Sequence, residues 1–381
     1  MPGDLEPAQQ LRLARSLAAI GEDAWRGLAS GDPFMSWAYL HAMHETGCAS
    51  PESGWSPCYL TLWDGGELRG AMPLYRKDHS WGEYVFDWAW ADAYQRHGHA
   101  YYPKLVCAVP FTPVTGARLL ARDDETRVAL ARAARAIAQT QGVSSLHVLF
   151  PSADNARILQ RAGYLMRTGV QFHWRNAGYR DFAEFLATLT HAKRKKIRQE
   201  RRKVSDAGVA FRRLRGDEIC DEDWAFFYRC YRHTYRAHRS SPYLNLEFFK
   251  ALGKGMPGQV LLALAERGGE RVAASLCLYN ARTLWGRYWG ALEFIPCLHF
   301  EACYYQPIEF CIEQAIEVFE GGAQGEHKLA RGFLPVATQS AHWLARPEFA
   351  DAVERFLARE TDGIAAYIDE LNEHAPYRKP G

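Results

Sequence analysis

The order of helix-like and strand-like segments constrains this fold more than any other feature of the sequence. In the first half, apolar residues recur at helical spacing in residues 8–29, 36–47, 123–142 and 154–163. Short alternating or continuous apolar runs, which are typical of strands, occupy residues 57–78, 104–111, 144–150 and 165–176.

The second half repeats this layout. Helical patterns cover residues 192–208, 221–238, 301–319, 339–345 and 347–374, and strand patterns cover residues 209–214 and 259–291. No residue-level repeat links the halves, but each has helices, then antiparallel strands, then a helix and further strands. This order predicts an α+β protein built from two similar halves.

Chain length supports two domains, because 381 residues exceed what one ordinary core accommodates. We expect a first domain at residues 1–180 and a second, which includes the C-terminal helices, at residues 181–381. Asp64-Gly65-Gly66 predicts a hairpin between alternating runs, and Pro307 predicts a kink in the helix that contains it.

Composition excludes several classes of protein. The net charge is +2, so a polyanionic partner would have to bind a local patch. The nine cysteines form no C-x-x-C pair, which favours a reducing compartment over a disulfide framework. The N-terminal residues lack a signal-peptide pattern, and no apolar run of about 18 residues occurs. We therefore expect a cytoplasmic protein without a membrane span.

The strongest chemical signal is the motif GEHKLARGF, which carries Glu326, His327, Lys328 and Arg331. Acyl transfer to an amine needs a base for the ammonium proton, which His327 and Glu326 can supply. It also needs positive groups for the oxyanion or an anionic ligand, which Lys328 and Arg331 can supply. A solvated polar loop is the alternative, but the flanking glycines favour a functional loop.

The charges of this motif carry a further argument. Three potentially cationic groups within five positions repel one another, and Glu326 can neutralise only one of them. An anionic ligand or a developing oxyanion is the simplest missing partner. We therefore expect alanine variants of His327, Lys328 and Arg331 to lose turnover while melting near the wild-type temperature.

The segment CLHFEACYYQPIE places Glu301, Tyr304 and Gln306 at an expected strand-to-helix junction. A carboxylate near a helix N-terminus is stabilised by the helix dipole, so Glu301 is a candidate catalytic residue and the other two are candidate substrate contacts. Helix capping with core tyrosines is an equally simple explanation. Cys297, His299 and Cys303 lack the paired spacing of metal ligands, and no metal is expected.

A third segment, DWAWADAYQRHGHAYYPK, is rich in aromatic and polar residues. Its density of Trp and Tyr suits the wall of a cleft for a sugar or peptide, although a loop packed over the first domain would share this composition. The candidate substrate-binding residues here are Asp87, Asp92, Tyr94, His97, Tyr102 and Lys104.

The run AKRKKIRQERRK predicts a basic helix with one buried stripe through Ile197 and Val204. Lys193, Arg194 and Arg198 are its candidate phosphate-binding residues. Such runs are often solvated surfaces, but a groove for a phosphate-bearing ligand is the functional alternative. Coenzyme A, a nucleotide-linked sugar and a tRNA acceptor stem all fit that description.

Several stretches resemble one family over nearly the whole chain. They include PFMSWAYLHAMHETG, EYVFDWAWADAYQRHGHAYYPKLVCAVPFTPVTGARLL, HFEACYYQPIEF and GAQGEHKLARGFLPV. They resemble the FemAB-like predicted N-acyltransferases, or peptidoglycan biosynthesis/recognition proteins, of the GNAT superfamily. The resemblance implies two tandem GNAT-like domains, each a mixed, largely antiparallel sheet flanked by helices, and transfer of an acyl or aminoacyl group to an amine.

The resemblance leaves the donor open between acyl-CoA and aminoacyl-tRNA. The Q/R-x-x-G-x-G/A loop of acetyl-CoA enzymes is absent, and TPVTGAR is its nearest substitute. We favour acyl-CoA as the donor and a small-molecule or peptide amine as the acceptor, because a tRNA-binding protein usually has a clearly basic face. An aminoacyl-tRNA-dependent transferase acting on a peptidoglycan precursor is the first alternative. A non-catalytic module that binds cell-wall fragments or RNA is the second.

Overall fold

The computed structural model describes residues 9–29, 31–322 and 325–378. It divides the chain into two compact units. The first contains the chain up to Gly169 together with residues 337–366, and the second contains residues 170–336 together with residues 367–381. The sequence suggested one cut at residue 180. In the structure, residues 170–180 belong to the second unit and most of the C-terminal region returns to the first.

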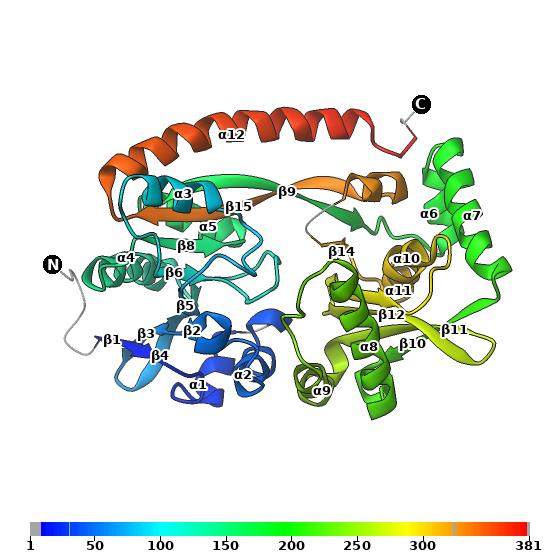
Figure 1. The fold of residues 1–381 in the computed structure, drawn as a ribbon, viewed down its shortest axis with the longest axis horizontal. Coiled ribbons are helices and arrows are strands. Elements are labelled where there is room, and N and C mark those ends of the chain that lie inside the picture. The colour runs from blue at the N-terminus through cyan, green and yellow to red at the C-terminus, as the bar shows by residue number, and fades with distance from the viewer. Residues whose placement is uncertain (1–8, 30, 323–324, 379–381) are drawn as a thin grey trace. The chain divides into compact units, whose positions relative to one another are not determined.

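The elements of the first unit alternate between groups of helices and groups of strands (Figure 1). In chain order they are β1 (Gln9–Ala14), α1 (Glu22–Arg26), η1 (Pro33–Met35), α2 (Trp37–Glu45), η2 (Pro51–Ser53), β2 (Trp55–Pro57), β3 (Tyr59–Asp64), β4 (Glu67–Met72), β5 (Leu74–Lys77), α3 (Trp88–Arg96), β6 (Lys104–Cys107), β7 (Leu120–Ala121), α4 (Asp124–Thr140), β8 (Ser145–Leu149) and α5 (Ala153–Arg161). Three elements are divided between the units, namely β9 (Leu165–Arg175), β15 (Leu334–Leu344) and α12 (Pro347–Glu373).

The strands of the first unit form two sheets. One has the order β1-β3-β4-β7, and the other contains the order β15-β8-β6-β5-β2. All described pairings are antiparallel except that of β6 with β8, which are parallel and joined by the crossover helix α4. The hairpin expected at Asp64-Gly65-Gly66 is confirmed between β3 and β4, with positive φ angles of 57° and 88° at the two glycines.

Helix α4 shows how the sequence specifies one of these elements. The carboxylate of Asp123 accepts a hydrogen bond of 2.7 Å from the backbone N–H of Thr126, which caps the first turn. The apolar side of the helix, which includes Leu130 and Ala134, is fully buried in the main core of the unit. The helix packs on β3 and β4 of one sheet and on β8 of the other, so the crossover contacts both sheets of the unit.

The second unit has the same alternation of helices and strands. Its elements are α6 (Phe182–Thr188), α7 (His191–Asp206), β10 (Val209–Arg215), η3 (Gly216–Glu218), α8 (Asp221–Ala237), α9 (Leu246–Gly255), η4 (Pro257–Gln259), β11 (Val260–Arg267), β12 (Glu270–Tyr279), β13 (Thr283–Ala291), α10 (Leu298–Phe300), the π-helical turn η5 (Glu301–Tyr305), α11 (Gln306–Glu313), β14 (Val318–Glu320) and η6 (Glu326–Arg331).

The sheet of the second unit has the strand order β10-β11-β12-β13-β14-β9, and only β13 and β14 are parallel among its described pairings. Neighbouring residues of β12 show that both faces are covered. Ala274 pairs with Gly290, where an added Cβ would come within 2.1 Å of the Cys230 carbonyl of α8. The next residue, Ser275, donates a hydrogen bond of 2.6 Å to Ala302 in η5. Because successive residues of a strand face opposite sides, α8 and η5 lie on opposite faces of this sheet.

Two expected helices are strands in the structure. Residues 8–29 contain β1, which pairs with β3, and only the short helix α1 follows. Residues 339–345 lie mostly in β15, where His342 pairs with His147 of β8. In both segments pairing with a neighbouring strand outweighs a helical spacing of apolar residues, which is a weak signal in short windows.

The kink expected at Pro307 appears as the π-helical turn η5, which ends directly before α11. Proline has no N–H to donate to the preceding turn, so the helix widens locally there. In the described part of the chain, no helix is both long and apolar enough to cross a membrane.

Candidate active site in the second unit

The parallel strands of the second unit part soon after they meet. β14 pairs only with Thr283, Leu284 and Trp285 at the start of β13, while β13 continues to Ala291 along β12. A bulge in β13 leaves Arg287 as an extra residue where the strands separate. Backbone N–H and C=O groups of the later part of β13 therefore have no strand partner on this side among the described residues.

Lys328 of η6 lies next to this point. Its Nζ donates a hydrogen bond of 3.0 Å to the carbonyl of Gly322, and Gly322 itself lies against the carbonyl of Gly286 in β13. The side chain is buried, and no carboxylate in the described ranges pairs with it. Burial, followed by the charge of Arg287, lowers the pKa of Lys328 to about 8. The ammonium form near neutral pH is thus a buried, uncompensated cation.

His327 precedes Lys328 and is exposed at the surface of η6. Its Nε2 lies 2.9 Å from the hydroxyl of the buried Tyr304 in η5. Partial burial and the nearby Arg331 and Lys328 charges lower the pKa of His327, so the neutral imidazole prevails near pH 7. The ring packs against Gly325, where a Cβ would come within 2.4 Å and φ is +119°. Only glycine fits this position.

Arg331 is held by groups outside its own motif. Its Nη2 donates a hydrogen bond of 2.7 Å to Glu200 of α7, and its Nη1 donates one of 2.6 Å to the carbonyl of His327. The guanidinium also lies 3.4 Å from the ring centroid of Phe300. The argument that the cationic cluster lacks an acidic partner is therefore wrong for Arg331, because Glu200 supplies a buried carboxylate.

The carboxylates proposed from the sequence are engaged in pairs. Glu301 accepts hydrogen bonds of 3.1 and 2.9 Å from Arg201 and one of 2.8 Å from Gln306. Glu326 accepts a hydrogen bond of 2.5 Å from the hydroxyl of Tyr367 in α12. The structure thus brings His327, Lys328 and Arg331 of η6 together with Tyr304 of η5. Glu301 and Gln306 lie in the same helical segment as Tyr304, at the start of η5 and of α11.

The candidate residues of the first unit fall into two groups. Asp87, Lys104 and Tyr102 belong to a polar network. Lys104 donates hydrogen bonds of 2.5 Å to Asp87 and 2.8 Å to Glu83, and all three of these side chains are buried. Tyr102 joins through its hydroxyl, 2.9 Å from that of Ser80.

The remaining three lie on or beside α3 and form no side-chain hydrogen bond with that network among the described residues. Tyr94 is buried and stacks on Phe349 with ring centroids 4.0 Å apart. Asp92 is exposed and pairs with Arg96 at 3.2 Å, while His97 is exposed and contacts the carbonyl of Ala93. These contacts are those of helix packing and helix termination.

The parallel strands of the first unit provide an internal comparison. Beyond β6 and β8 the chain closes on itself, since Gly116 forms a bridge with Pro151. Arg118, which is fully buried, fills the space and donates a hydrogen bond of 2.9 Å to the carbonyl of Leu149 and a second bond to that of Val114. In the first unit a buried arginine therefore lies beside the end of the parallel strand β8.

On the basic helix α7, the buried stripe expected through Ile197 and Val204 is confirmed and also includes Glu200. Lys193 and Arg194 are half-buried and Arg198 is exposed. Glu200 escaped the sequence reasoning, although its place three residues after Ile197 on the stripe was a usable signal. Arg287 escaped it as well, because a bulge leaves no pattern in the sequence. In the described ranges no group of three His, Cys, Asp or Glu side chains could hold a metal ion.

Comparison with known proteins supports this architecture. Comparison with curated proteins gave no match. Among solved structures, FemX aligns over 90% of this chain and 100% of its own, with 11% identity and a TM-score of 0.52. A conserved protein of unknown function from Bacteroides thetaiotaomicron aligns over 87% and 99%, with 11% identity and a TM-score of 0.53. A tandem GNAT protein from the clavulanic acid biosynthesis pathway aligns over 89% and 99%, with 11% identity and a TM-score of 0.46.

Identities this low establish the fold alone, and the fold is α+β, with mixed, largely antiparallel sheets flanked by helices, as in FemX. A family model gives the stronger relationship, since it matches residues 16–379. This chain belongs to the FemAB-like family, described as peptidoglycan biosynthesis/recognition.

Proposed function

We propose that this protein is an N-acyltransferase whose second unit moves an acyl group from acyl-CoA to an amine. The observation that carries the proposal is the buried, uncompensated Lys328 ammonium beside the point where β13 and β14 separate. Placing a cation there without an acidic partner costs stability. A negative charge that develops during a reaction is the partner that such a group is suited to stabilise.

In the proposed reaction the amine nitrogen attacks the carbonyl carbon of the thioester. A C–N bond forms, and the carbonyl π electrons move to oxygen, where Lys328 stabilises the oxyanion. His327 takes the proton that the nitrogen loses, because its lowered pKa keeps the ring neutral. Collapse of the intermediate breaks the C–S bond, and the coenzyme A thiolate leaves and takes up a proton from solvent.

Other residues of the cluster position these two. Tyr304 fixes the orientation of the His327 ring through the 2.9 Å contact with Nε2. Arg331 connects η6 to α7 through Glu200, which fixes the backbone that carries both His327 and Lys328. In this proposal Glu301 orients Arg201 rather than acting as a base, since three hydrogen bonds already engage its carboxylate.

The edge of β13 beyond Trp285 has no strand partner among the described residues, although its Trp289 carbonyl accepts a hydrogen bond of 3.0 Å from the Thr234 hydroxyl. This edge supports acyl-CoA as the donor. Unpaired N–H and C=O groups of a strand can pair with an extended chain that carries amides. The pantetheine arm of coenzyme A is such a chain, whereas the terminal adenosine of an aminoacyl-tRNA is not. In the first unit the carbonyl of Leu149 at the end of β8 already accepts a hydrogen bond from the buried Arg118, so we assign the donor to the second unit.

A donor screen tests the proposal. Purified protein should release free thiol from one of a panel of acyl-CoA thioesters, and the release should require an amine from a panel of amino acids, polyamines, amino sugars and short peptides. If the protein consumes aminoacyl-tRNA but no acyl-CoA, the donor is aminoacyl-tRNA and the assignment of acyl-CoA is wrong. Consumption of neither donor would favour a non-catalytic module that binds cell-wall fragments or RNA.

A further inference from the structure

A second feature of this unit is a pocket beside α7. It has a volume of about 590 Å³ and is lined by residues of α6, α7, β10, η5 and the start of α11. Its lining residues are Phe182, Leu186, Arg198, Arg201, Arg202, Val204, Ser205, Val209, Phe211, Glu301 and Gln306. The volume is in the range of pockets that take small ligands.

The α7 wall is strongly basic. Arg198, Arg201, Arg202 and Ser205 are spaced i, i+3, i+4 and i+7, so they lie on one face of the helix. Arg201 is neutralised by Glu301 and also by Glu309, whose carboxylate is 2.7 Å from Nη1.

Arg198 and Arg202 differ from Arg201, since neither forms an ion pair with any carboxylate in the described ranges. Glu301 is the only acid of the lining and is already engaged, so the pocket keeps two uncompensated guanidinium groups. Side chains four residues apart on a helix are neighbours, with about 5–6 Å between their Cβ atoms. Two planar guanidinium forks at this spacing match the oxygens of a phosphate chain.

The lining from α6 and β10 is apolar. Phe182 and Phe211 are half-buried, Leu186 and Val209 are buried, and the Phe182 ring centroid already lies 4.6 Å from the Arg201 guanidinium. A pocket with a cationic wall, aromatic rings and the amide of Gln306 suits a ligand that joins phosphate groups to a flat ring. Inorganic phosphate alone would leave the aromatic wall without a contact.

We propose that this pocket binds a nucleoside diphosphate group, with its phosphates on Arg198 and Arg202 and its nucleoside against Phe182 and Phe211. Neither His327 nor Lys328 lines this site, whereas Glu301 and Arg201, which have an orienting role in the proposed acyl transfer, do. Binding of coenzyme A here would rest on that proposed function, and binding of a free nucleotide would go beyond it. The group can belong to a free nucleotide or to coenzyme A, and the chemistry recognised is the same. The assignment moves the phosphate contacts from Lys193 and Arg194, which do not line the pocket, to Arg198 and Arg202.

Calorimetric titration tests the proposal with ADP, coenzyme A, inorganic pyrophosphate and adenosine. Wild-type protein should bind ADP or coenzyme A at least about tenfold more tightly than either pyrophosphate or adenosine alone, because both walls contribute. Arg198→Ala/Arg202→Ala should weaken that binding by about a hundredfold, with an unchanged thermal melt. Tighter binding of coenzyme A than of ADP would assign the nucleotide to the acyl donor, and the reverse order would assign it to a free nucleotide.

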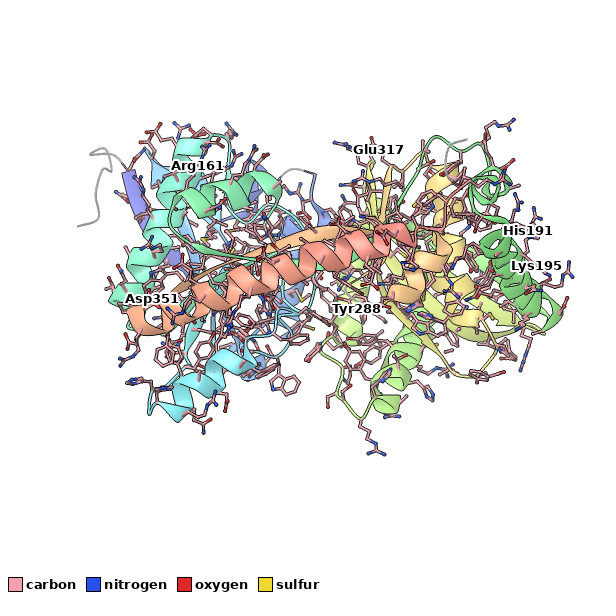
Figure 2. The ribbon with its side chains drawn as sticks, turned by 90° about the horizontal axis from the view of Figure 1, so that it is seen from above. Arg161, His191, Lys195, Tyr288, Glu317 and Asp351 are labelled. Atoms are coloured by element: carbon pink, nitrogen blue, oxygen red, sulfur yellow. The ribbon has the colours of Figure 1, made fainter. Side chains whose placement is uncertain are left out.

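A matched control removes the same charge from the same helix. Lys195 and Lys196 are exposed and lie outside the pocket, and Lys195 points outward from α7 in Figure 2. Lys195→Ala/Lys196→Ala should bind the nucleotide as wild type does. Equal losses of nucleotide affinity in both double variants would show a general attraction between a basic helix and an anion, and would overturn the site. Pyrophosphate binding as tight as ADP binding, or a marked preference for an RNA hairpin, would overturn the nucleotide assignment.

This outcome is separable from that of the donor screen. Amine-dependent thiol release that the Arg198→Ala/Arg202→Ala variant retains, together with unchanged nucleotide binding, would reject the pocket and keep the acyltransferase. Nucleotide binding that depends on the two arginines, in a protein that consumes no donor, would keep the pocket and reject the acyltransferase.

Discussion

At the residue scale, the contacts and burial of a histidine pair in the first unit determine the protonation state of both rings. Nδ1 of His147 lies 2.8 Å from Nδ1 of His342, so one ring must donate and the other accept. Burial, with the Lys104 charge next, lowers the pKa of His147 to about 3, and burial with His147 also lowers the pKa of His342. Both rings are therefore neutral across the physiological range.

The neighbours then decide which ring donates. The hydroxyl of Tyr101 donates to Asp87 at 2.6 Å, so its oxygen accepts from Nε2–H of His147, 3.0 Å away. His147 must accept at Nδ1, and His342 must carry its proton there. We expect nitrogen-15 spectra of labelled histidines to show the Nε2–H tautomer for His147 and the Nδ1–H tautomer for His342. An imidazolium signal from either ring at pH 7 would contradict this assignment.

The proposed roles of His327 and Lys328 predict a bell-shaped pH profile of kcat/KM. The rate should rise with pH as His327 loses its proton, below the ordinary histidine value, because the neutral ring is the base. It should fall as pH rises through about 8, where Lys328 loses the charge that stabilises the oxyanion.

Lys328→Arg separates the two limbs of that profile. A guanidinium stays protonated throughout this range, so the alkaline limb should move upward even if the maximal rate is lower. After kcat/KM is expressed per free-base acceptor amine, a wild-type rate that instead rises through pH 8 would make the neutral Lys328 amine the active form and reverse its proposed role.

At the scale of elements, the pair of Arg331 and Glu200 connects η6 to α7. Both side chains are buried, so removing one partner leaves an uncompensated charge in the interior. We expect Arg331→Ala to lower the free energy of unfolding by about 3–5 kcal/mol, measured by urea denaturation. This replaces the expectation from the sequence that this variant would melt near the wild-type temperature.

Removing both partners gives the control for that prediction. Arg331→Met/Glu200→Leu/Tyr305→Phe should recover most of the lost stability, because an apolar group of similar volume avoids the desolvation cost. Tyr305→Phe is included because the Tyr305 hydroxyl donates a hydrogen bond to Glu200 and would otherwise be left unpaired. A single variant as stable as wild type would show that the ion pair does not fix η6, and the positioning role of Arg331 would fail.

The individual helices and strands also show how much of the fold could be predicted from the sequence. α4 was predictable, since its cap at Asp123 and its apolar stripe agree with its tertiary contacts. β1 and β15 were not, because their strand character comes from pairing with β3 and β8, which are distant in sequence. The π-turn η5 was foreseen only as a kink at Pro307, because a proline indicates where a helix is perturbed but not how.

At the scale of the whole molecule, the tandem α+β layout followed from the order of elements and from a family resemblance that now rests on residues 16–379. The return of residues 337–366 to the first unit could not be predicted, because it depends on where β15 and α12 pack. The motif around His327 was recognisable as a local cluster. Its partner Glu200 lies more than a hundred positions away, and only the fold brings the two together.

The most direct test of the central claim is a paired measurement on Lys328→Met, which keeps the length of the side chain and removes only its charge. Removing an unpaired buried charge should leave the melting temperature at or above the wild-type value. The same change should lower amine-dependent acyl transfer by about 10²- to 10³-fold, as expected for loss of an oxyanion donor. A variant that transfers at the wild-type rate, or that loses activity only in proportion to lost folded protein, would contradict the assignment of the active site to η6 of the second unit.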